Sequence, residues 1–303
     1  MTLLDEPPVP VEQVEAANPE LERKAERAES RRGFFHALPA YAYLIFFFAI
    51  PLVIVFIFSF AGRTRTGKPV VGEWTLEAWQ KMGDPLVRSI AFRSLWLAVA
   101  NTVICLLIAY PFSYWIATRR RPSTRNLLLV LVLIPFWTNF LVRTYAWRVL
   151  LDSDGLITRV GEATGLWGQM LFTTPAVFIG LLYGYLPFMV LPLYAAIERL
   201  DWSLVEAGRD LYANGWNAFR KITLPLSKPG IIAGSILVFI PSLGAYVTPD
   251  ILGGAKNPLL GNYIVLQFQS ARNWPFGAAL SFTILAAMLI ATTIYFRTGG
   301  RTL

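Results

Sequence analysis

The stretch LPAYAYLIFFFAIPLVIVFIFSF, residues 38–60, decides the fold class, because it contains no charged residue from end to end. An apolar run of roughly 18 residues or more can cross the hydrocarbon core of a bilayer as a helix. Further mainly apolar runs follow over residues 95–118, 127–149, 175–197, 231–247 and 276–296. The sequence therefore predicts an all-α, polytopic membrane protein with about six transmembrane helices.

The segments before the first span and after the last are short compared with the region of the spans. The 303 residues are 55% hydrophobic, which is more than soluble domains usually contain. We expect a charged tail over residues 1–37, a transmembrane domain over 38–297 and a C-terminal segment over 298–303. The tail is too long and too acidic for the start of a cleaved signal peptide, so the first span is expected to remain as an anchor.

Basic residues beside the spans set the expected orientation. Four arginines, at positions 119, 120, 121 and 125, separate the second and third spans, and Arg31 and Arg32 precede the first. Lys and Arg in short loops favour the cytoplasmic side. We therefore expect both termini and the loop over 198–229 to be cytoplasmic. The net charge of +8 suits membrane lipid head groups, and no soluble basic domain predicts nucleic acid binding.

Charged side chains are nearly absent from the depth of the predicted spans. Arg143 is the exception. Counted from Leu127 at about 1.5 Å per residue, it lies roughly 24 Å along its helix, near the outer edge of a hydrocarbon core of about 30 Å. There it either snorkels to the interface or faces a pathway. The lack of deep carboxylates disfavours proton or sodium coupling, so an ion-coupled carrier or a channel is the weaker alternative.

The chain carries no convincing site for chemistry. The segment GRTRTGKP, residues 62–69, matches the phosphate-binding pattern GxxxxGK but has Pro69 where Ser or Thr would bind magnesium. Cys105 and His36 are the only residues of their types, so no metal site is predicted. We expect no catalytic residue and no cofactor on this chain, and any ATP and Mg would bind to a separate subunit.

The loop over residues 198–229 differs from the other loops. Its sequence is ERLDWSLVEAGRDLYANGWNAFRKITLPLSKP. Leu204, Val205, Gly208, Leu211 and Tyr212 recur at three- and four-residue spacing, which indicates a helix with one apolar face. Such a helix either lies on the membrane surface or enters a groove on a partner protein.

The ends of this helix also have signals. Asp201 or Ser203 would cap its start, and Asn214 with Gly215 would end it. A second short helix is expected over residues 216–222, stopping before Pro225. Two short helices joined by a turn could transmit a movement from a partner to the spans.

This loop resembles the EAA loop of ABC-importer permeases. The resemblance rests on Glu206, Ala207 and Gly208 and on the Ile-x-Leu-Pro end at residues 222–225. Gly208 replaces the third residue of the motif, an alanine. Tyr212 occupies the position of the usual glycine, whose turn conformation a tyrosine adopts only with strain. Asn214 and Gly215 offer another place for that turn.

Three further stretches are similar to the spermidine/putrescine (polyamine) class of these permeases. They are IPFWTNFLVRTYAW at 134–147, VTPDILGGAKNPLLGNYI at 247–264 and QFQSARNWPFGAALS at 267–281. The resemblance implies a type I ABC-importer permease architecture and a role in polyamine import across the bacterial inner membrane. It also implies a second and different permease, two ATPase subunits that bind ATP and Mg, and a periplasmic or extracellular substrate-binding protein.

The resemblance also assigns roles to residues. The ATPase-coupling residues are Glu206, Ala207, Gly208, Arg209, Asp210, Leu211, Tyr212, Leu224 and Pro225. Among them, Glu206, Arg209 and Asp210 would make polar contacts, and Leu211 and Tyr212 the apolar ones.

A polyamine is a flexible polycation, which carboxylates and aromatic faces can bind. Candidates for its path are Trp137, Arg143, Tyr145, Trp147, Asp152, Tyr185, Tyr246 and Asp250. Any one of the aromatic residues could instead belong to an interfacial belt. An amino-acid-like, thiamine-like or ferric compound is the alternative substrate.

Overall fold

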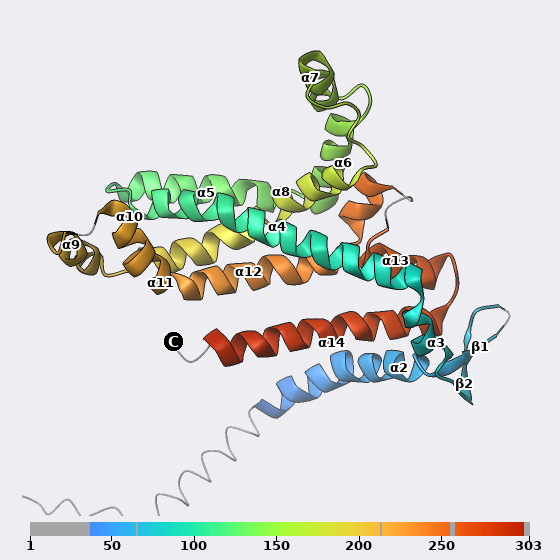
Figure 1. Ribbon diagram of the computed structural model, residues 1–303. Coiled ribbons are helices and arrows are strands. Elements are labelled where there is room, and N and C mark those ends of the chain that lie inside the picture. Colours follow the sequence, from blue (N-terminus) through green and yellow to red (C-terminus); the bar gives the residue numbers. More distant parts are fainter. Residues whose placement is uncertain (1–36, 65, 213, 255–257, 300–303) are drawn as a thin grey trace, which may run out of the picture. The chain divides into compact units, whose positions relative to one another are not determined.

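The computed structural model describes residues 37–64, 66–212, 214–254 and 258–299 (Figure 1). The predicted tail therefore lies almost wholly outside the described residues, as does most of the C-terminal segment. The chain divides at Val55/Phe56 into two units. In the first unit, a helix runs from Ala37, includes the π-helical turn η1 (Ile45–Ala49) and continues as α2 (Ile50–Phe58), which extends into the second unit.

A β-hairpin opens the second unit. Strands β1 (Ala61–Arg63) and β2 (Pro69–Trp74) pair antiparallel. The turn contains Gly67 at φ 88°, and the Gly67 N–H donates to the Thr64 carbonyl over 2.9 Å. The stretch that resembles a phosphate-binding loop is thus a hairpin turn, with no helix N-terminus following it to bind phosphate.

The remaining elements are helical. They are α3 (Glu77–Gln80), η2 (Lys81–Gly83), α4 (Pro85–Ala117), α5 (Pro122–Trp137), α6 (Phe140–Leu151), α7 (Leu156–Thr164), α8 (Thr174–Glu198), α9 (Trp202–Asp210), α10 (Gly215–Ala218), η3 (Phe219–Thr223), α11 (Leu224–Leu226), α12 (Lys228–Leu243), η4 (Pro249–Gly253), α13 (Leu260–Gln269) and α14 (Trp274–Gly299).

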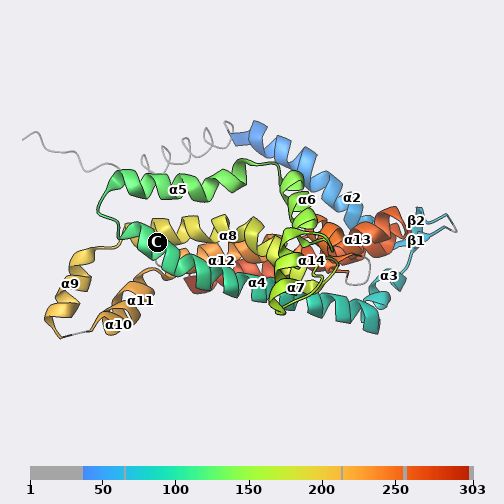
Figure 2. The ribbon, with the colours of Figure 1, turned by 90° about the horizontal axis from the view of Figure 1, so that it is seen from above.

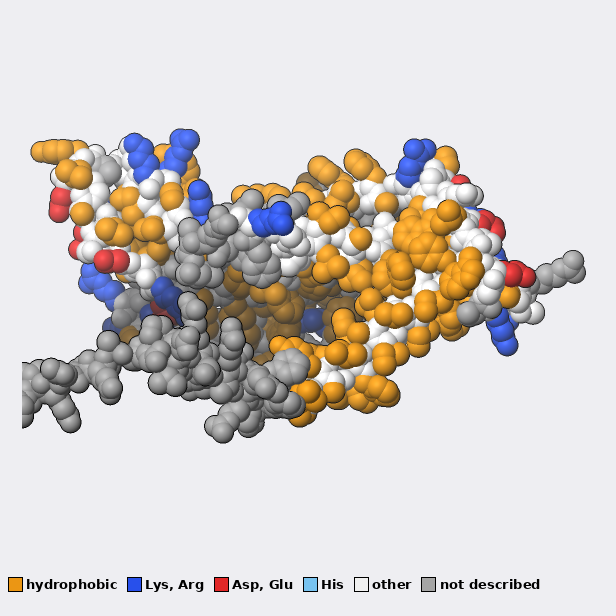
Figure 3. Space-filling view, turned by 90° about the horizontal axis from the view of Figure 1, so that it is seen from below, with side chains coloured by type: hydrophobic (Ala, Val, Ile, Leu, Met, Phe, Trp, Pro, Cys, Tyr) orange, Lys and Arg blue, Asp and Glu red, His pale blue; other side chains and the backbone are white. Residues whose placement is uncertain are grey.

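Four of the described helical segments are long and apolar enough to cross a membrane: Ala37–Phe58, Pro85–Ala117, Thr174–Glu198 and Trp274–Thr293. Two bent pairs raise the number to six if each is one span. Apolar side chains cover most of the described surface in Figure 3, and charged ones gather mainly toward its two ends. The second predicted span begins at Pro85, ahead of the expected Leu95, and the fifth ends at Leu243, ahead of Val247.

The structure divides the predicted span 127–149 into two helices, α5 and α6, and the helical segment Phe140–Thr164, which begins with α6, is bent by 88° from α5. The Thr138 hydroxyl donates to the Pro135 carbonyl over 2.7 Å and so closes α5. Asn139 then caps α6, its side chain accepting from the Leu141 N–H over 2.9 Å. The estimated depth of Arg143 is therefore wrong, because the helix on which it was counted ends at Trp137.

Helices α4, α8 and α12 form the core of the second unit. Cys105 of α4, Met189 of α8 and Val238 of α12 belong to one buried cluster. Glycines let α12 approach α8 closely, since a Cβ at Gly230 would lie 2.7 Å from the Pro192 carbonyl oxygen. Cys105 is buried in this core, as expected of a packing residue.

Polar side chains join α4 to α12, α8 and α13. Asn101 donates to Ser242 Oγ of α12 over 2.9 Å. Ser113 donates to the Val190 carbonyl of α8 over 3.1 Å, and Ser94 Oγ accepts from the Leu260 N–H of α13 over 2.7 Å. Such bonds within apolar surroundings fix the register of the helices that they join.

Figures 1 and 2 place α9, α10 and the α4–α5 turn at one end of these core helices. Helices α6, α7 and α13 lie at the opposite end. The predicted coupling loop and most predicted pathway residues are thus far apart.

Candidate functional site

The predicted coupling loop is a helical hairpin. Asp201 caps α9, its Oδ1 accepting from the Ser203 N–H over 3.0 Å. Bonds from the Ser203 hydroxyl and backbone N–H lower the pKa of Asp201, so the carboxylate persists at neutral pH and the cap is lost only as the pH falls through that lowered pKa. Of the two predicted caps, the structure selects Asp201.

The turn after α9 lies at Tyr212. This residue has φ 61°, in the left-handed region that the usual glycine would adopt. Its N–H donates to the Arg209 carbonyl over 2.9 Å. Asn214 does not end α9 but caps α10, accepting from the Asn217 N–H over 2.8 Å. The expectation that Asn214 and Gly215 would end the helix is therefore wrong.

The second arm of the hairpin runs further than predicted. Helical turns cover α10, η3 and α11 and pass through Pro225 before a bend of 63° leads into α12. The five residues of η3 form a wider π-helical turn. Because proline lacks an N–H and its ring crowds the carbonyl four residues earlier, a wider turn before Pro225 lets the helix continue.

One face of α9 packs inward. Val205 is buried, and a Cβ at Gly208 would lie 2.5 Å from Ile222 Cδ1. Gly208 thus allows α9 to contact the Ile-x-Leu-Pro segment closely. Leu224 of that segment packs against the core cluster of α4 and α8, and Pro225 is exposed.

The other face of the hairpin has no partner among the described residues. Glu206, Ala207, Arg209 and Asp210 are exposed. Leu211 is 82% exposed and Tyr212 is 99% exposed. The predicted apolar face is therefore divided, because Val205 packs inward whereas Leu211 and Tyr212 do not. Uncovered apolar side chains beside charged ones are typical of a surface that binds another protein.

Aromatic contacts connect the hairpin to α4. The Phe219 ring lies 5.6 Å from Tyr110 and 6.3 Å from Tyr114, both edge-on. Tyr114 also meets Trp202 of α9 at 6.1 Å. Movement of either arm of the hairpin would therefore press on the end of α4.

A hydrogen bond extends this contact to the bend before α12. Ser227 donates to the Leu224 carbonyl over 3.1 Å, and its Oγ lies 2.8 Å from the Tyr110 hydroxyl. Because the single Ser227 proton is used, Tyr110 is the donor in the second bond.

The strain at Tyr212 can be tested by substitution. A side chain in the left-handed region costs roughly 1 kcal/mol, and β-branched residues tolerate it least. We expect hydrogen exchange of the amides over 209–216 to be unchanged or slower in Tyr212→Gly and about fivefold faster in Tyr212→Val. Faster exchange in the glycine variant than in the valine variant would contradict a left-handed Tyr212.

Two of the predicted pathway residues, Tyr185 and Tyr246, line one groove of about 350 Å³. The Tyr185 hydroxyl donates to the Pro241 carbonyl over 3.2 Å. Tyr246 is 47% exposed. The other residues that line this groove are Phe140, Ile240, Pro241, Gly244, Ala245, Val247, Thr248 and Met288.

Arg143 and Trp147 belong to a second group, on α6. The Arg143 guanidinium donates to the Pro135 carbonyl over 2.7 Å and lies 5.6 Å from the Tyr183 ring centroid. The Trp147 ring lies 5.5 Å from the same tyrosine. Arg143 thus stabilises the α5–α6 corner, because it satisfies a carbonyl that the bend leaves without its helical partner.

The structure does not bring the remaining candidates into the groove. Trp137 is 82% exposed at the end of α5, and Tyr145 is 52% exposed. Asp152 accepts from the Ser153 N–H, and Asp250 is an exposed residue of η4. No carboxylate is among the described residues that line the groove, so the expected pairing of carboxylates with aromatic faces does not occur there.

Phe140 and Tyr183 were missed as candidates. Phe140 lies in the matched stretch 134–147, which was a usable signal. Tyr183 joins Arg143 to Trp147 only through tertiary packing, which the sequence does not show. The described residues contain no group of His, Cys, Asp and Glu that could hold a metal ion.

Comparisons with known proteins agree with this geometry. Residues 109–299 match the family described as the binding-protein-dependent transport system inner membrane component. The chain belongs to this family. It is an ABC-importer permease, a transport subunit whose ATP is hydrolysed by a separate ATPase subunit.

Several curated permeases of this family are similar over most of their length. The spermidine/putrescine transport system permease protein PotB of Haemophilus influenzae is 42% identical over 85% of this chain and 90% of its own. PotB of Escherichia coli is 40% identical over 84% and 93%. The inner membrane ABC transporter permease protein YdcU of Escherichia coli is 34% identical over 75% and 76%.

The fold is also that of a solved importer. A chain of a bacterial ABC transporter that imports the acidic polysaccharide alginate superposes with a TM-score of 0.69 at 14% identity, covering 92% of this permease and 99% of that chain. The predicted all-α, polytopic ABC-permease fold is confirmed.

Proposed function

We propose that this permease forms part of the pathway by which spermidine and putrescine cross the bacterial inner membrane. The observation that carries the proposal is the 40–42% identity, over most of the chain, to permeases named for these polyamines.

The groove beside Tyr185 supports part of this proposal. Tyr185, Tyr246 and Phe140 offer aromatic faces, which attract ammonium groups. Because no described groove residue is a carboxylate, we infer that the second permease, a different chain, supplies the negative charges on the facing side of the pathway. This permease would then contribute aromatic contacts to the pathway, and the second permease would contribute carboxylates.

The hairpin is the proposed docking site for the ATPase dimer. Its exposed face, from Glu206 to Tyr212, would enter a groove of the ATPase, which binds ATP and Mg. Closure of the dimer would push Phe219 against α4 and change access to the groove at the far end. The hairpin, both termini and the α4–α5 turn then lie on the cytoplasmic side, as their arginines favour.

A periplasmic substrate-binding protein would deliver the polyamine at the opposite end. A solved relative of similar fold was determined in complex with an alginate pentasaccharide-bound periplasmic protein. In this permease, the end that carries α6, α7 and α13 is the corresponding docking face.

The substrate can be tested with the reconstituted importer and its cognate binding protein. We expect the binding protein to bind spermidine or putrescine, and proteoliposomes to accumulate the labelled polyamine only when ATP is present. An excess of an unlabelled amino acid, thiamine or ferric compound should not compete. A binding protein that ignores both polyamines and binds one of these solutes would overturn the polyamine assignment.

A further inference from the structure

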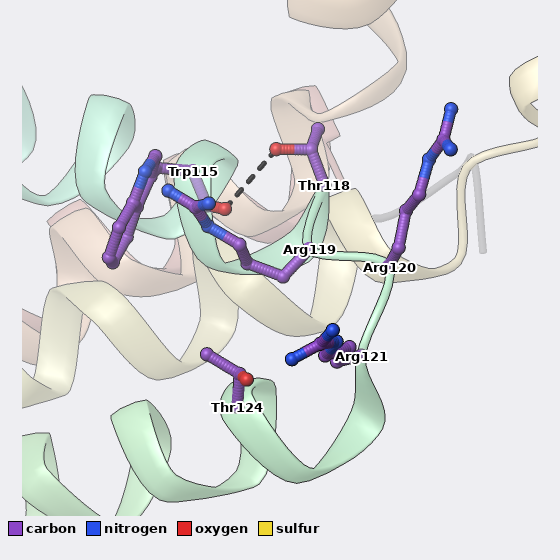
Figure 4. Close-up of a pocket in the computed structure, with 6 residues that line it drawn as sticks. All are labelled: Trp115, Thr118, Arg119, Arg120, Arg121 and Thr124. Carbon is purple, nitrogen blue, oxygen red and sulfur yellow. Dashed lines mark hydrogen bonds between the residues drawn. The ribbon is translucent and has the colours of Figure 1, made fainter.

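The turn between α4 and α5 contains a basic pocket that the transport pathway does not use. The pocket has a volume of about 630 Å³ (Figure 4). It is lined by Trp115, Thr118, Arg119, Arg120, Arg121 and Thr124. The α4–α5 turn lies at the same end of the core helices as α9 and α10 (Figure 1), and the pocket shares no lining residue with the groove beside Tyr185.

Only some of these six side chains point into the pocket. The Arg119 guanidinium lies 4.0 Å from the centre of the Trp115 ring, which holds it in place. Figure 4 shows Arg121 extending toward Thr124, whereas Arg120 extends away from the other five residues. The Thr118 hydroxyl is already used, because it donates to the backbone carbonyls of Tyr114 and Trp115.

No described carboxylate forms an ion pair with the arginines of this pocket. No Asp or Glu occurs between Pro85 and Leu151. Among the described residues, the two ion pairs are Lys81 with Glu77 and Arg125 with Glu198, and neither involves the three arginines of the pocket. Guanidinium groups without a carboxylate favour an anionic ligand, above all a phosphate, which they bind through paired N–H donors.

An apolar groove adjoins the basic pocket. It has a volume of about 560 Å³ and is lined by Ile108, Ala109, Pro111, Phe112, Trp115, Leu186 and Val190. Trp115 lines both spaces. From Trp115 the groove follows α4 back to Ile108, about 10 Å toward the middle of the span at about 1.5 Å per residue.

We propose that these two spaces together bind one anionic phospholipid of the surrounding membrane. Its phosphate lies between Arg119 and Arg121, with the Thr124 hydroxyl as a further donor, and an acyl chain occupies the groove along α4. The order of the two spaces matches that of a lipid, since the charged part lies at the helix end and the apolar part runs toward the bilayer centre. A soluble phosphate ion would occupy the basic pocket alone and leave the apolar groove empty.

The test uses the assembled importer and counts bound lipid by native mass spectrometry. The probes are dioleoyl phosphatidylglycerol, which is anionic, and dioleoyl phosphatidylcholine, which is zwitterionic. We expect the wild type to bind the first at least tenfold more tightly. The double variant Arg119→Gln, Arg121→Gln should lose on the order of 30-fold in affinity for phosphatidylglycerol.

Arg120→Gln is the control, because it removes a positive charge from the same turn but from a side chain that points away; it removes one charge, and the double variant removes two. Arg120→Gln should change the affinity less than threefold. A loss of about fivefold in Arg120→Gln, the same per charge removed as in the double variant, would show a general charge effect and overturn the site. Equal binding of the two lipids by the wild type would do so as well.

A second measurement needs no variant. A photoactivatable phosphatidylglycerol with its reactive group on the acyl chain is added to wild-type importer in nanodiscs. We expect cross-links within residues 108–115 and at Leu186 or Val190. If the lipid labels the partner permease or other segments of this chain while these residues remain unlabelled, the groove is not a lipid site.

Discussion

Glu206→Arg is expected to abolish co-purification of the ATPase subunits with this permease and to reduce ATP-driven uptake at least a hundredfold. Glu206 is exposed on the outer face of α9, and no described residue pairs with it. In the proposed docking, reversing its charge would place a cation against a partner surface that complements an anion, and a like-charge contact of this kind costs several kcal/mol. The measurement is the amount of ATPase retained on tagged permease.

Glu162→Arg is the control for this experiment. Glu162 is also exposed and lies on α7, at the opposite end from α9 (Figure 1). The same charge reversal there should leave ATPase retention unchanged. Full retention in Glu206→Arg would remove the hairpin as the docking site, whatever the substrate proves to be.

Phe219→Ala should slow transport without weakening the docking of the ATPase. The Phe219 ring contacts Tyr110 and Tyr114 of α4, whereas the exposed face of α9 does not depend on it. We therefore expect ATPase retention close to that of the wild type and an uptake rate at least tenfold lower, because the push no longer reaches α4. The readouts are ATPase retention and uptake in the same proteoliposome preparation.

Phe268→Ala provides the comparison. Phe268 makes a similar edge-on contact, with Trp274 at 5.7 Å, but it lies on α13 at the far end. Phe268→Ala should lower thermal stability by an amount similar to Phe219→Ala. The amount of polyamine taken up per ATP hydrolysed should stay at the wild-type value. If Phe219→Ala transports at the wild-type rate, the aromatic contact is not the route by which force enters the spans.

The sequence predicts the membrane helices well, because a long run of apolar residues rarely occurs in a protein except as a membrane span. The turn after α9 was predicted at Asn214 and Gly215, but it lies at Tyr212, which has the backbone conformation that the usual glycine would adopt.

Features that depend on where a helix stops were harder to predict. Leu211 and Tyr212 continue the apolar spacing of α9, yet the helix ends at Asp210, so helical periodicity no longer determines where they point. The α5–α6 corner was missed because the run 127–149 was assessed by hydrophobicity alone. The Asn139 cap was a readable signal within it.

The pathway was the least predictable part. Tyr185 and Tyr246 come together only because α8 packs against α12 and the segment that follows it. Asp152 and Asp250, chosen for their charge and their place near span ends, lie outside the groove. Proximity across helices is a tertiary property, which spacing along one chain does not encode.

The hydrogen bonds from Asn101, Ser113 and Ser94 make α4 inseparable from α12, α8 and α13. These helices should therefore tilt as a single block. With α4 about 50 Å long at about 1.5 Å per residue, a tilt of about six degrees around one end displaces the other by roughly 5 Å. A small rotation at the end that carries the hairpin is thus enough to open or close a passage of solute size at the other, without any helix having to unfold or slide.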